Sequence, residues 1–176
     1  RRIDRIVGEV LQLNRRDRQQ PEVFALGEFV RALIDEIVQA ENIPLKSVVI
    51  LVPEEIQVIF DRGHLNQIIW NLVRNALQSG ASAVSLRSRA EHHVQIADTL
   101  SKLALRIEIA DNGRGVPEDL HEQIFLPLVS GRAEGTGLGL PLALQIAREH
   151  RGSLSFRSRP GHTVFTLLLP VPEVTP

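Results

Sequence analysis

Two glycine-rich segments in the second half of the chain have the residue types needed to hold a nucleotide. The first is Asp111-Asn-Gly-Arg-Gly115, and the second is Gly135-Thr-Gly-Leu-Gly-Leu140, about two dozen residues later. A carboxylate can accept a hydrogen bond from the amine of a base, and backbone N–H groups at the start of a helix attract phosphates. Arg132, in the loop before the second segment, could reach a phosphate or could be a solvated loop charge. Each segment alone is weak evidence, because Asp-x-Gly-x-Gly also forms ordinary turns.

A polar stripe accompanies the most regular helical pattern in the chain, which predicts a helix over residues 62–79. Its buried face is expected to contain Leu65, Ile68, Ile69, Leu72, Val73, Ala76 and Leu77. At about 100° per residue, Asn71, Asn75 and Gln78 flank this face. A carboxamide oxygen suits Mg²⁺, which prefers oxygen ligands and keeps phosphates and waters as the others. The alternative is that these amides bind nearby backbone groups.

Asp111 follows an alternating run, Leu103–Ala110, that predicts a half-buried strand. It has the same parity as Ile107 and Ile109, so we expect its side chain to point to the buried face. A buried carboxylate needs strong donors. An adenine amine and the backbone N–H groups of residues 112–115 both remain candidates.

Helices expected at 26–40, 62–79 and 137–148 alternate with strands. The runs Ser47–Val52 and Ile56–Phe60 are split by Pro53 and predict a hairpin, whereas residues 90–102 read as a polar connection. The fold class expected is α+β, a two-layer α/β sandwich with a mixed sheet and helices on one face.

The chain divides into three parts. Residues 1–20 comprise a helix over residues 1–18 and a polar linker. In the helix, Ile3, Ile6, Val10 and Leu13 follow a seven-residue pattern that needs a partner: either the chain's own domain or a dimeric helical bundle. Residues 21–170 form the main domain, and residues 171–176 are a proline-rich tail.

Composition excludes several classes of protein. The 176 residues carry a net charge of −1 and contain no cysteine, so disulfides and thiolate metal sites are excluded and nucleic acid is not an expected partner. No apolar run approaches the roughly 20 residues that span a bilayer. Methionine is absent even at position 1, which predicts a fragment.

The order of these motifs resembles the catalytic, ATP-binding domain of two-component sensor histidine kinases, in the superfamily that also contains gyrase, Hsp90 and MutL. The N box, G1 box, F box, G2 box and closing strand of that family are similar to residues 65–77, 111–115, 124–127, 135–140 and 160–165. The resemblance covers residues 20–170. Residues 127–132 look most like the nitrogen-regulation kinases of the NtrB type, and the N-terminal segment is similar to the pilus-regulation kinases of the PilS type. Both types act on activators of sigma-54 promoters.

The resemblance implies the Bergerat ATP-binding fold, with ATP and Mg²⁺ as cofactors. It implies that Asn75 holds Mg²⁺, that Asn71 lies beside the phosphates, that Arg132 assists them, and that Asp111 binds the adenine amine. The other nucleotide-binding residues implied are Gly113, Gly115, Val116, Gly135, Thr136, Gly137, Leu138, Gly139, Leu140 and Thr163.

The sequence departs from the patterns of related proteins at two positions that affect the reaction. Many relatives carry a basic residue where Gln78 stands, which leaves the phosphate charge to Mg²⁺, Arg132 and Arg74. Hydrolytic relatives place a glutamate general base at position 71. Because Asn71 cannot take a proton from water, transfer to another acceptor is expected.

That acceptor is expected outside the chain. None of the six histidines has the family's His-Glu/Asp-x-x-x-Pro setting, and after His121-Glu122 the proline at position 127 is one residue too far. The implied partners are a histidine-bearing dimerisation hairpin of the same protein, ending at residues 1–18, and a response regulator, within a homodimeric parent. The implied location is cytoplasmic, without membrane contact by this fragment, and whether the parent is membrane-bound is left open. The alternatives are an ATPase of the gyrase or Hsp90 type, an ATP-regulated interaction module, and a serine kinase of the anti-sigma type.

Overall fold

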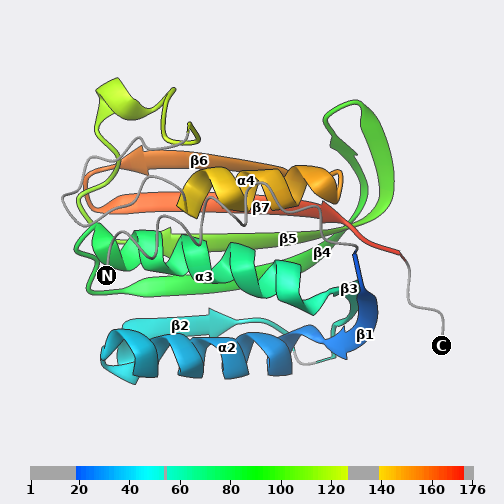
Figure 1. Cartoon of the computed structure of the whole chain (residues 1–176), viewed down its shortest axis with the longest axis horizontal. Helices are drawn as coiled ribbons and strands as arrows, with labels where there is room; N and C mark the ends of the chain where they lie inside the picture. The colour runs from blue at the N-terminus through cyan, green and yellow to red at the C-terminus, as the bar shows by residue number, and fades with distance from the viewer. Residues whose placement is uncertain (1–18, 54, 127–138, 173–176) are drawn as a thin grey trace.

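The computed structural model describes residues 19–53, 55–126 and 139–172, and shows one layer of helices on one face of a sheet (Figure 1). The helices are α2 (Leu26–Glu41), α3 (Arg62–Gln78) and α4 (Gly139–Glu149), with short 3-10 helices at Leu45–Ser47 and Glu118–Leu120. The strands are β1 (Pro21–Ala25), β2 (Val48–Leu51), β3 (Gln57–Asp61), β4 (Val84–Ile96), β5 (Thr99–Asp111), β6 (Ser153–Arg159) and β7 (His162–Pro170). The predicted two-layer sandwich is confirmed.

The main sheet has the order β2-β4-β5-β7-β6. Strand β2 runs parallel to β4, and the other neighbours are antiparallel, so the sheet is mixed as predicted. From Leu105 to the end of β5 every second side chain is buried, including Ile107 and Ile109. This alternation turns one face of the sheet toward the helices.

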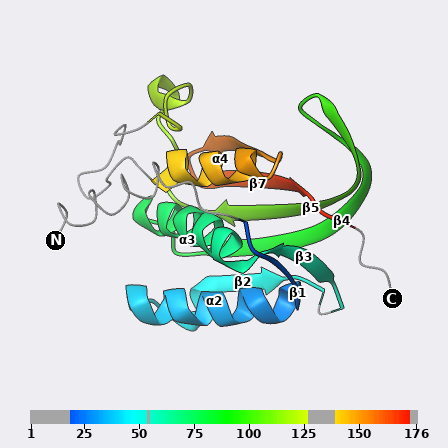
Figure 2. The ribbon, with the colours of Figure 1, turned by 45° about the vertical axis from the view of Figure 1, so that its right-hand side comes forward.

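The helices contribute the other half of the core, and their apolar stripes face the sheet. In α3 the six buried residues are Leu65, Ile68, Ile69, Leu72, Val73 and Ala76, each at most 1% exposed. Helix α3 lies between α2 and α4 (Figures 1 and 2). One long side of α3 therefore faces α2, and the other faces α4.

The hairpin predicted from Ser47–Val52 and Ile56–Phe60 is wrong. Strand β2 pairs with β4 in the main sheet, whereas β3 pairs antiparallel with β1 in a separate two-stranded sheet. The local pattern identified both strands but not their partners, because pairing is decided by long-range contacts.

Residues 90–102, predicted as a connection, instead complete the long β4–β5 hairpin. Ile96 pairs with Thr99 across a turn in which Ala97 has a φ of 51°. Within the described ranges no third strand pairs with this end of the hairpin, which projects from the sheet (Figure 1). Apart from Ile96, which is buried, the side chains of residues 90–102 are exposed or half-buried, so this segment lacks the apolar alternation that marks a strand.

Asp61 begins α3 and also holds the incoming chain. Its Oδ1 accepts a hydrogen bond from the backbone N–H of His64 (3.0 Å), which makes it the N-cap of α3, and its Oδ2 accepts one from the backbone N–H of Gln20 (2.8 Å). The Nδ1 of His64 lies 2.7 Å from Nε2 of His150 at the end of α4, and the His150 ring packs on Phe60. These contacts join the linker to the start of α3 and the end of α4.

His150 is expected to make stability depend on pH. Burial and the neighbouring His64, opposed by Asp61, lower its pKa from 6.5 to about 4. Below pH 6.5 His150 is therefore protonated in the unfolded chain, whereas in the folded protein it stays neutral down to about pH 4. The free energy of unfolding falls as the pH drops through this window. Allowing for solvent screening of a half-buried group, we expect a loss of about 1 kcal/mol between pH 7 and pH 5.

Urea unfolding at both pH values measures this loss. His150→Gln is expected to flatten the dependence, whereas His92→Gln on the exposed hairpin should leave it unchanged. An equally steep dependence in His150→Gln would show that another group is responsible.

Candidate nucleotide-binding site

Asp111 is the last residue of β5, and its side chain points to the helix-covered face, as its parity predicted. It is 5% exposed. Its Oδ1 accepts hydrogen bonds from the backbone N–H of Gly113 (2.9 Å) and from Oγ of Ser79 (3.3 Å). The turn therefore supplies one donor to the carboxylate, as one of the two expected alternatives, and Ser79 at the end of α3 supplies another.

Gly113 brings this turn against the end of α3. A Cβ at position 113 would overlap the side-chain oxygen of Ser79 and would lie 2.8 Å from its carbonyl oxygen. The backbone N–H of Arg114 donates to that carbonyl (3.1 Å). Only glycine fits this approach, which places the α3 end beside Asp111.

The next residues reach β6 and β7. Gly115 has a φ of +83°, a backbone region that favours glycine. The N–H of Val116 donates to Oγ of Ser158 (2.8 Å), which lies 2.7 Å from Oγ1 of Thr163, and Thr163 pairs with Asp111 across the sheet. Gly115, Val116 and Thr163 thus meet around the end of β5.

Asn71 and Asn75 lie half-buried on α3. A Cβ added to Gly139, the first residue of α4, would lie 3.6 Å from Oδ1 of Asn71. The start of α4, where helix dipole and unpaired N–H groups favour anions, therefore adjoins Asn71. The Nδ2 atom of Asn71 is buried and has no hydrogen-bond partner among the described residues.

The segment before residue 127 is anchored by aromatic packing. Ile124 is 7% exposed, and the ring of Phe125 lies 6.0 Å from Phe156 and 6.5 Å from Phe165, centroid to centroid. The predictions for Arg132, Gly135, Thr136, Gly137 and Leu138 fall outside the described residues. Gly139 and Leu140 are described, at the start of α4.

Comparison with known proteins decides the family. The family of histidine kinase-, DNA gyrase B- and HSP90-like ATPases matches residues 60–173, which is more than half of the chain. The chain belongs to this family. The matched residues include Asn71, Asn75 and Asp111.

Curated members of the family include close relatives. The sensory histidine kinase/phosphatase NtrB of Vibrio alginolyticus is 39% identical over 119 residues, which are 65% of this chain and 34% of that protein. NtrB of Klebsiella oxytoca is 40% identical over 114 residues, 63% of this chain and 33% of that protein. The chain spans about a third of the length of these relatives.

Solved structures of the family share the fold. The nucleotide-free catalytic domain of histidine kinase ThkA has a TM-score of 0.65 at 26% identity, over 86% of this chain and 95% of that domain. ThkA in complex with the response regulator TrrA gives 0.68 at 25% identity, over 96% and 47%. Full-length ShkA in complex with AMPPNP, at 19% identity, supports the fold alone, with a TM-score of 0.74 over 99% of this chain and 37% of that chain. The fold of this chain is that of a histidine kinase catalytic domain.

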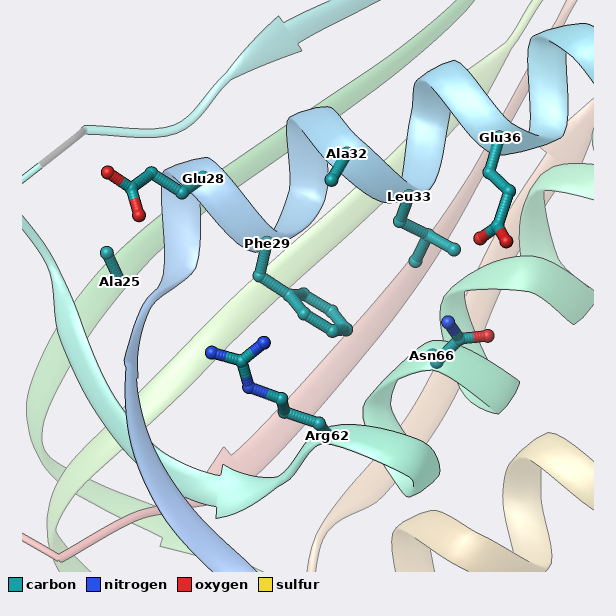
Figure 3. A pocket seen from close by; sticks show the side chains of 8 residues that line it. All are labelled: Ala25, Glu28, Phe29, Ala32, Leu33, Glu36, Arg62 and Asn66. Carbon is teal, nitrogen blue, oxygen red and sulfur yellow. The ribbon is translucent and has the colours of Figure 1, made fainter.

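A groove lies between α2 and α3 (Figure 3). It has a volume of about 400 Å³ and is lined by Ala25, Glu28, Phe29, Ala32, Leu33, Glu36, Arg62 and Asn66. Arg62 precedes Asn71 by nine residues, and Asn66 precedes Asn75 by nine. Nine residues at about 100° each put side chains on opposite sides of a helix. The groove therefore faces α2, away from the two asparagines.

Arg74 also faces α2, and its predicted role at the phosphates is not supported. Its Nε lies 3.3 Å from Oε1 of Glu41, the last residue of α2. The ion pair neutralises the charge that a phosphate would need.

The residues present fit a nucleotide and Mg²⁺. Asn71 offers a buried amide nitrogen without a described partner, and the start of α4 at Gly139 lies beside it. In the part of the chain that the structure describes, no three His, Cys, Asp or Glu side chains group to hold a metal ion. A metal here would depend on carboxamide and phosphate oxygens, which suits Mg²⁺.

Sequence reasoning missed Ser79. It is 6% exposed, and its Oγ lies 2.7 Å from the carbonyl oxygen of Ala76 and 3.3 Å from Asp111. A serine directly after an amphipathic helix signals only a helix end, so nothing in the sequence pointed to its contact with a strand 32 residues away.

Proposed function

We propose that this chain is the ATP-binding catalytic domain of a sensor histidine kinase, which transfers the γ-phosphoryl group to a histidine outside the chain. The observation that carries the proposal is the convergence of two boxes: the α3 face with Asn71 and Asn75, and the turn with Asp111. The buried amide of Asn71 adjoins the start of α4, where phosphates are favoured.

In this proposal Asp111 accepts a hydrogen bond from the adenine amine, and Gly113, Gly115, Val116 and Thr163 shape the base pocket. Asn75 supplies a carboxamide oxygen to Mg²⁺, and Asn71 donates its amide to a phosphate. Mg²⁺, when bound, neutralises phosphate charge. Arg132 and residues 135–138 would complete the phosphate side, with Gly139 and Leu140 at the helix start.

The reaction is a displacement at phosphorus. A histidine ring nitrogen forms a bond to the γ-phosphorus while the bond to the β–γ bridging oxygen breaks, and ADP leaves with that electron pair. The protein's contribution is positioning and charge stabilisation. Asn71 cannot accept a proton from water, so hydrolysis is slow and the γ-phosphoryl group is kept for the histidine.

The remaining parts belong to the parent protein. We propose that residues 1–20 end the second helix of a histidine-bearing dimerisation hairpin in a homodimer, and that the phosphoryl group passes to a response regulator in the cytoplasm. The similarity to NtrB favours a regulator that activates sigma-54 promoters. The structure contains no described helix long and apolar enough to cross a bilayer.

A labelling experiment on the full-length parent tests the proposal. With ATP labelled at the γ-phosphate, we expect label on the protein that withstands alkali and is lost in acid, as for phosphohistidine. With ATP well below its dissociation constant, Asp111→Asn should reduce the label at least about tenfold. Acid-stable label would indicate a serine kinase, and bound ATP without any label would indicate a non-catalytic module; either result contradicts the proposal.

Asn71→Glu is expected to turn the site toward hydrolysis. A carboxylate at this position can take a proton from water, and general bases contribute about 10²- to 10⁴-fold, so we expect acceptor-independent phosphate release to rise at least about tenfold. Phosphate release by the chain with Mg²⁺ and ATP measures it. Asn66→Glu, on the α2 side of the same helix, is the matched control and should not raise it. If Asn71→Glu binds ATP but releases phosphate no faster, Asn71 does not face the γ-phosphate.

A further inference from the structure

Two groups of Ser79, its carbonyl oxygen and its hydroxyl, hold the end of α3 against the G1 turn, and its backbone N–H continues the helix. Its backbone N–H donates to the carbonyl oxygen of Asn75 (3.2 Å), and its own carbonyl oxygen accepts from the N–H of Arg114 (3.1 Å). Its hydroxyl lies between the carbonyl oxygen of Ala76 and Oδ1 of Asp111. One residue therefore links the helix that carries Asn75 to the carboxylate at the end of β5.

The side chain at position 79 has little freedom. Ser79 is 6% exposed, and the missing Cβ of Gly113 is the space that its Oγ fills. A longer side chain would have to displace the G1 turn. Alanine would remove the hydroxyl, whose single proton can be donated to the carbonyl oxygen of Ala76 or to Oδ1 of Asp111. Removing a donor from beside a buried charged acceptor is unfavourable. Serine thus matches both the space and the hydrogen-bonding demand.

We infer that Ser79 is a positioning residue for base recognition, which holds the Asp111 carboxylate in the plane that accepts the adenine 6-amine. The inference rests on the proposed function. Two donors on one oxygen, the Ser79 hydroxyl and the Gly113 N–H, restrict rotation of the carboxylate about its Cβ–Cγ bond. Without the hydroxyl this restraint on rotation is removed, and the alignment of the carboxylate with the amine is weakened.

The consequence is selectivity rather than overall affinity. A carboxylate only accepts hydrogen bonds, so it favours the amine of adenine and disfavours the 6-oxo group of guanine. If Ser79 sets its direction, removing the hydroxyl weakens binding of nucleotides that have the 6-amine and spares those that lack it. A general loosening of the turn would weaken both alike.

The test compares ADP with purine riboside 5′-diphosphate, which lacks only the 6-amine, by calorimetric titration in the presence of Mg²⁺. The wild-type chain should prefer ADP at least tenfold. Ser79→Ala should reduce this preference to threefold or less while changing the affinity for the purine diphosphate less than twofold. Ser79→Cys, with a weaker donor of similar size, should give an intermediate preference and serves if Ser79→Ala fails to fold.

Ser88→Ala is the matched control. Ser88 on β4 is 5% exposed, and its Oγ has no hydrogen-bond partner among the described residues. Its replacement should leave the tenfold preference intact, with thermal unfolding confirming that all variants fold.

The outcomes separate the two proposals. If the wild-type chain binds neither nucleotide, or binds both equally, the proposed function or the role of Asp111 fails. If the wild-type chain prefers ADP and the Ser79 variants keep that preference, or lose affinity for both nucleotides in parallel, Ser79 is not a positioning residue.

Discussion

Replacing Asp111 by asparagine is expected to weaken binding of ATP with Mg²⁺ by about 10- to 100-fold. The carboxylate accepts from Gly113 and Ser79, and in the proposed complex also from the adenine amine. Asparagine keeps the shape but offers one oxygen and a nitrogen that donates, so at least one donor loses its acceptor. A hydrogen bond to a charged group is worth about 1.5–3 kcal/mol, which corresponds to this range. Calorimetric titration with AMP-PNP measures it.

Asp98→Asn is the control for this loss. Asp98 lies in the exposed turn of the β4–β5 hairpin, so the same change of charge there should leave nucleotide affinity within about twofold, because a remote surface charge is screened by salt. Unchanged affinity in Asp111→Asn, with the fold intact, would remove Asp111 from the nucleotide site.

Gly113→Ala is expected to have the second large effect. The added Cβ would overlap Ser79 and would lie 3.0 Å from Oδ1 of Asp111. Overpacking in a buried site costs about 1–3 kcal/mol, and the turn can relieve it only by moving away from α3. We therefore expect the free energy of unfolding in urea to fall by about 2 kcal/mol, and nucleotide binding to fall by more than about 10-fold because the Asp111 carboxylate loses its contact with Ser79.

Gly80→Ala is the control that replaces a glycine without creating a steric clash like the one expected at position 113. Gly80 has a φ of +81°, but nothing lies within 4 Å of its missing Cβ. Alanine at position 80 should lower the free energy of unfolding by about 1–2 kcal/mol, because a residue with a Cβ is strained at positive φ. It should leave nucleotide affinity unchanged. If Gly113→Ala and Gly80→Ala behave alike in both measurements, close packing of the G1 turn on α3 is not what the site requires.

Much of the fold could be predicted because its signals are local. The stripe from Leu65 to Ala76 gave α3 within one residue at its end, and alternation in β5 gave the inward direction of Asp111. The polar flank of Asn71 and Asn75 was found for the same reason, because a helix converts spacing directly into direction.

The parts that failed depend on distant contacts. Strand β2 pairs with β4, and β3 pairs with β1. The local sequence around Pro53 does not indicate either partner. Arg74 was a candidate for the phosphates on charge alone, but its side chain forms an ion pair with Glu41 at the end of α2. Ser79 was missed because its importance comes from Gly113 and Asp111, which reach it only when the sheet and α3 pack together.

The measurement that tests the central claim most directly is calorimetric titration of the chain with AMP-PNP in Mg²⁺ and again with the metal chelated. If Asn75 and the G1 turn converge on one metal-bound triphosphate, the titration shows a single site per chain whose affinity falls when Mg²⁺ is removed. A correctly folded chain that takes up no nucleotide, or binds it equally well without Mg²⁺, would contradict this account.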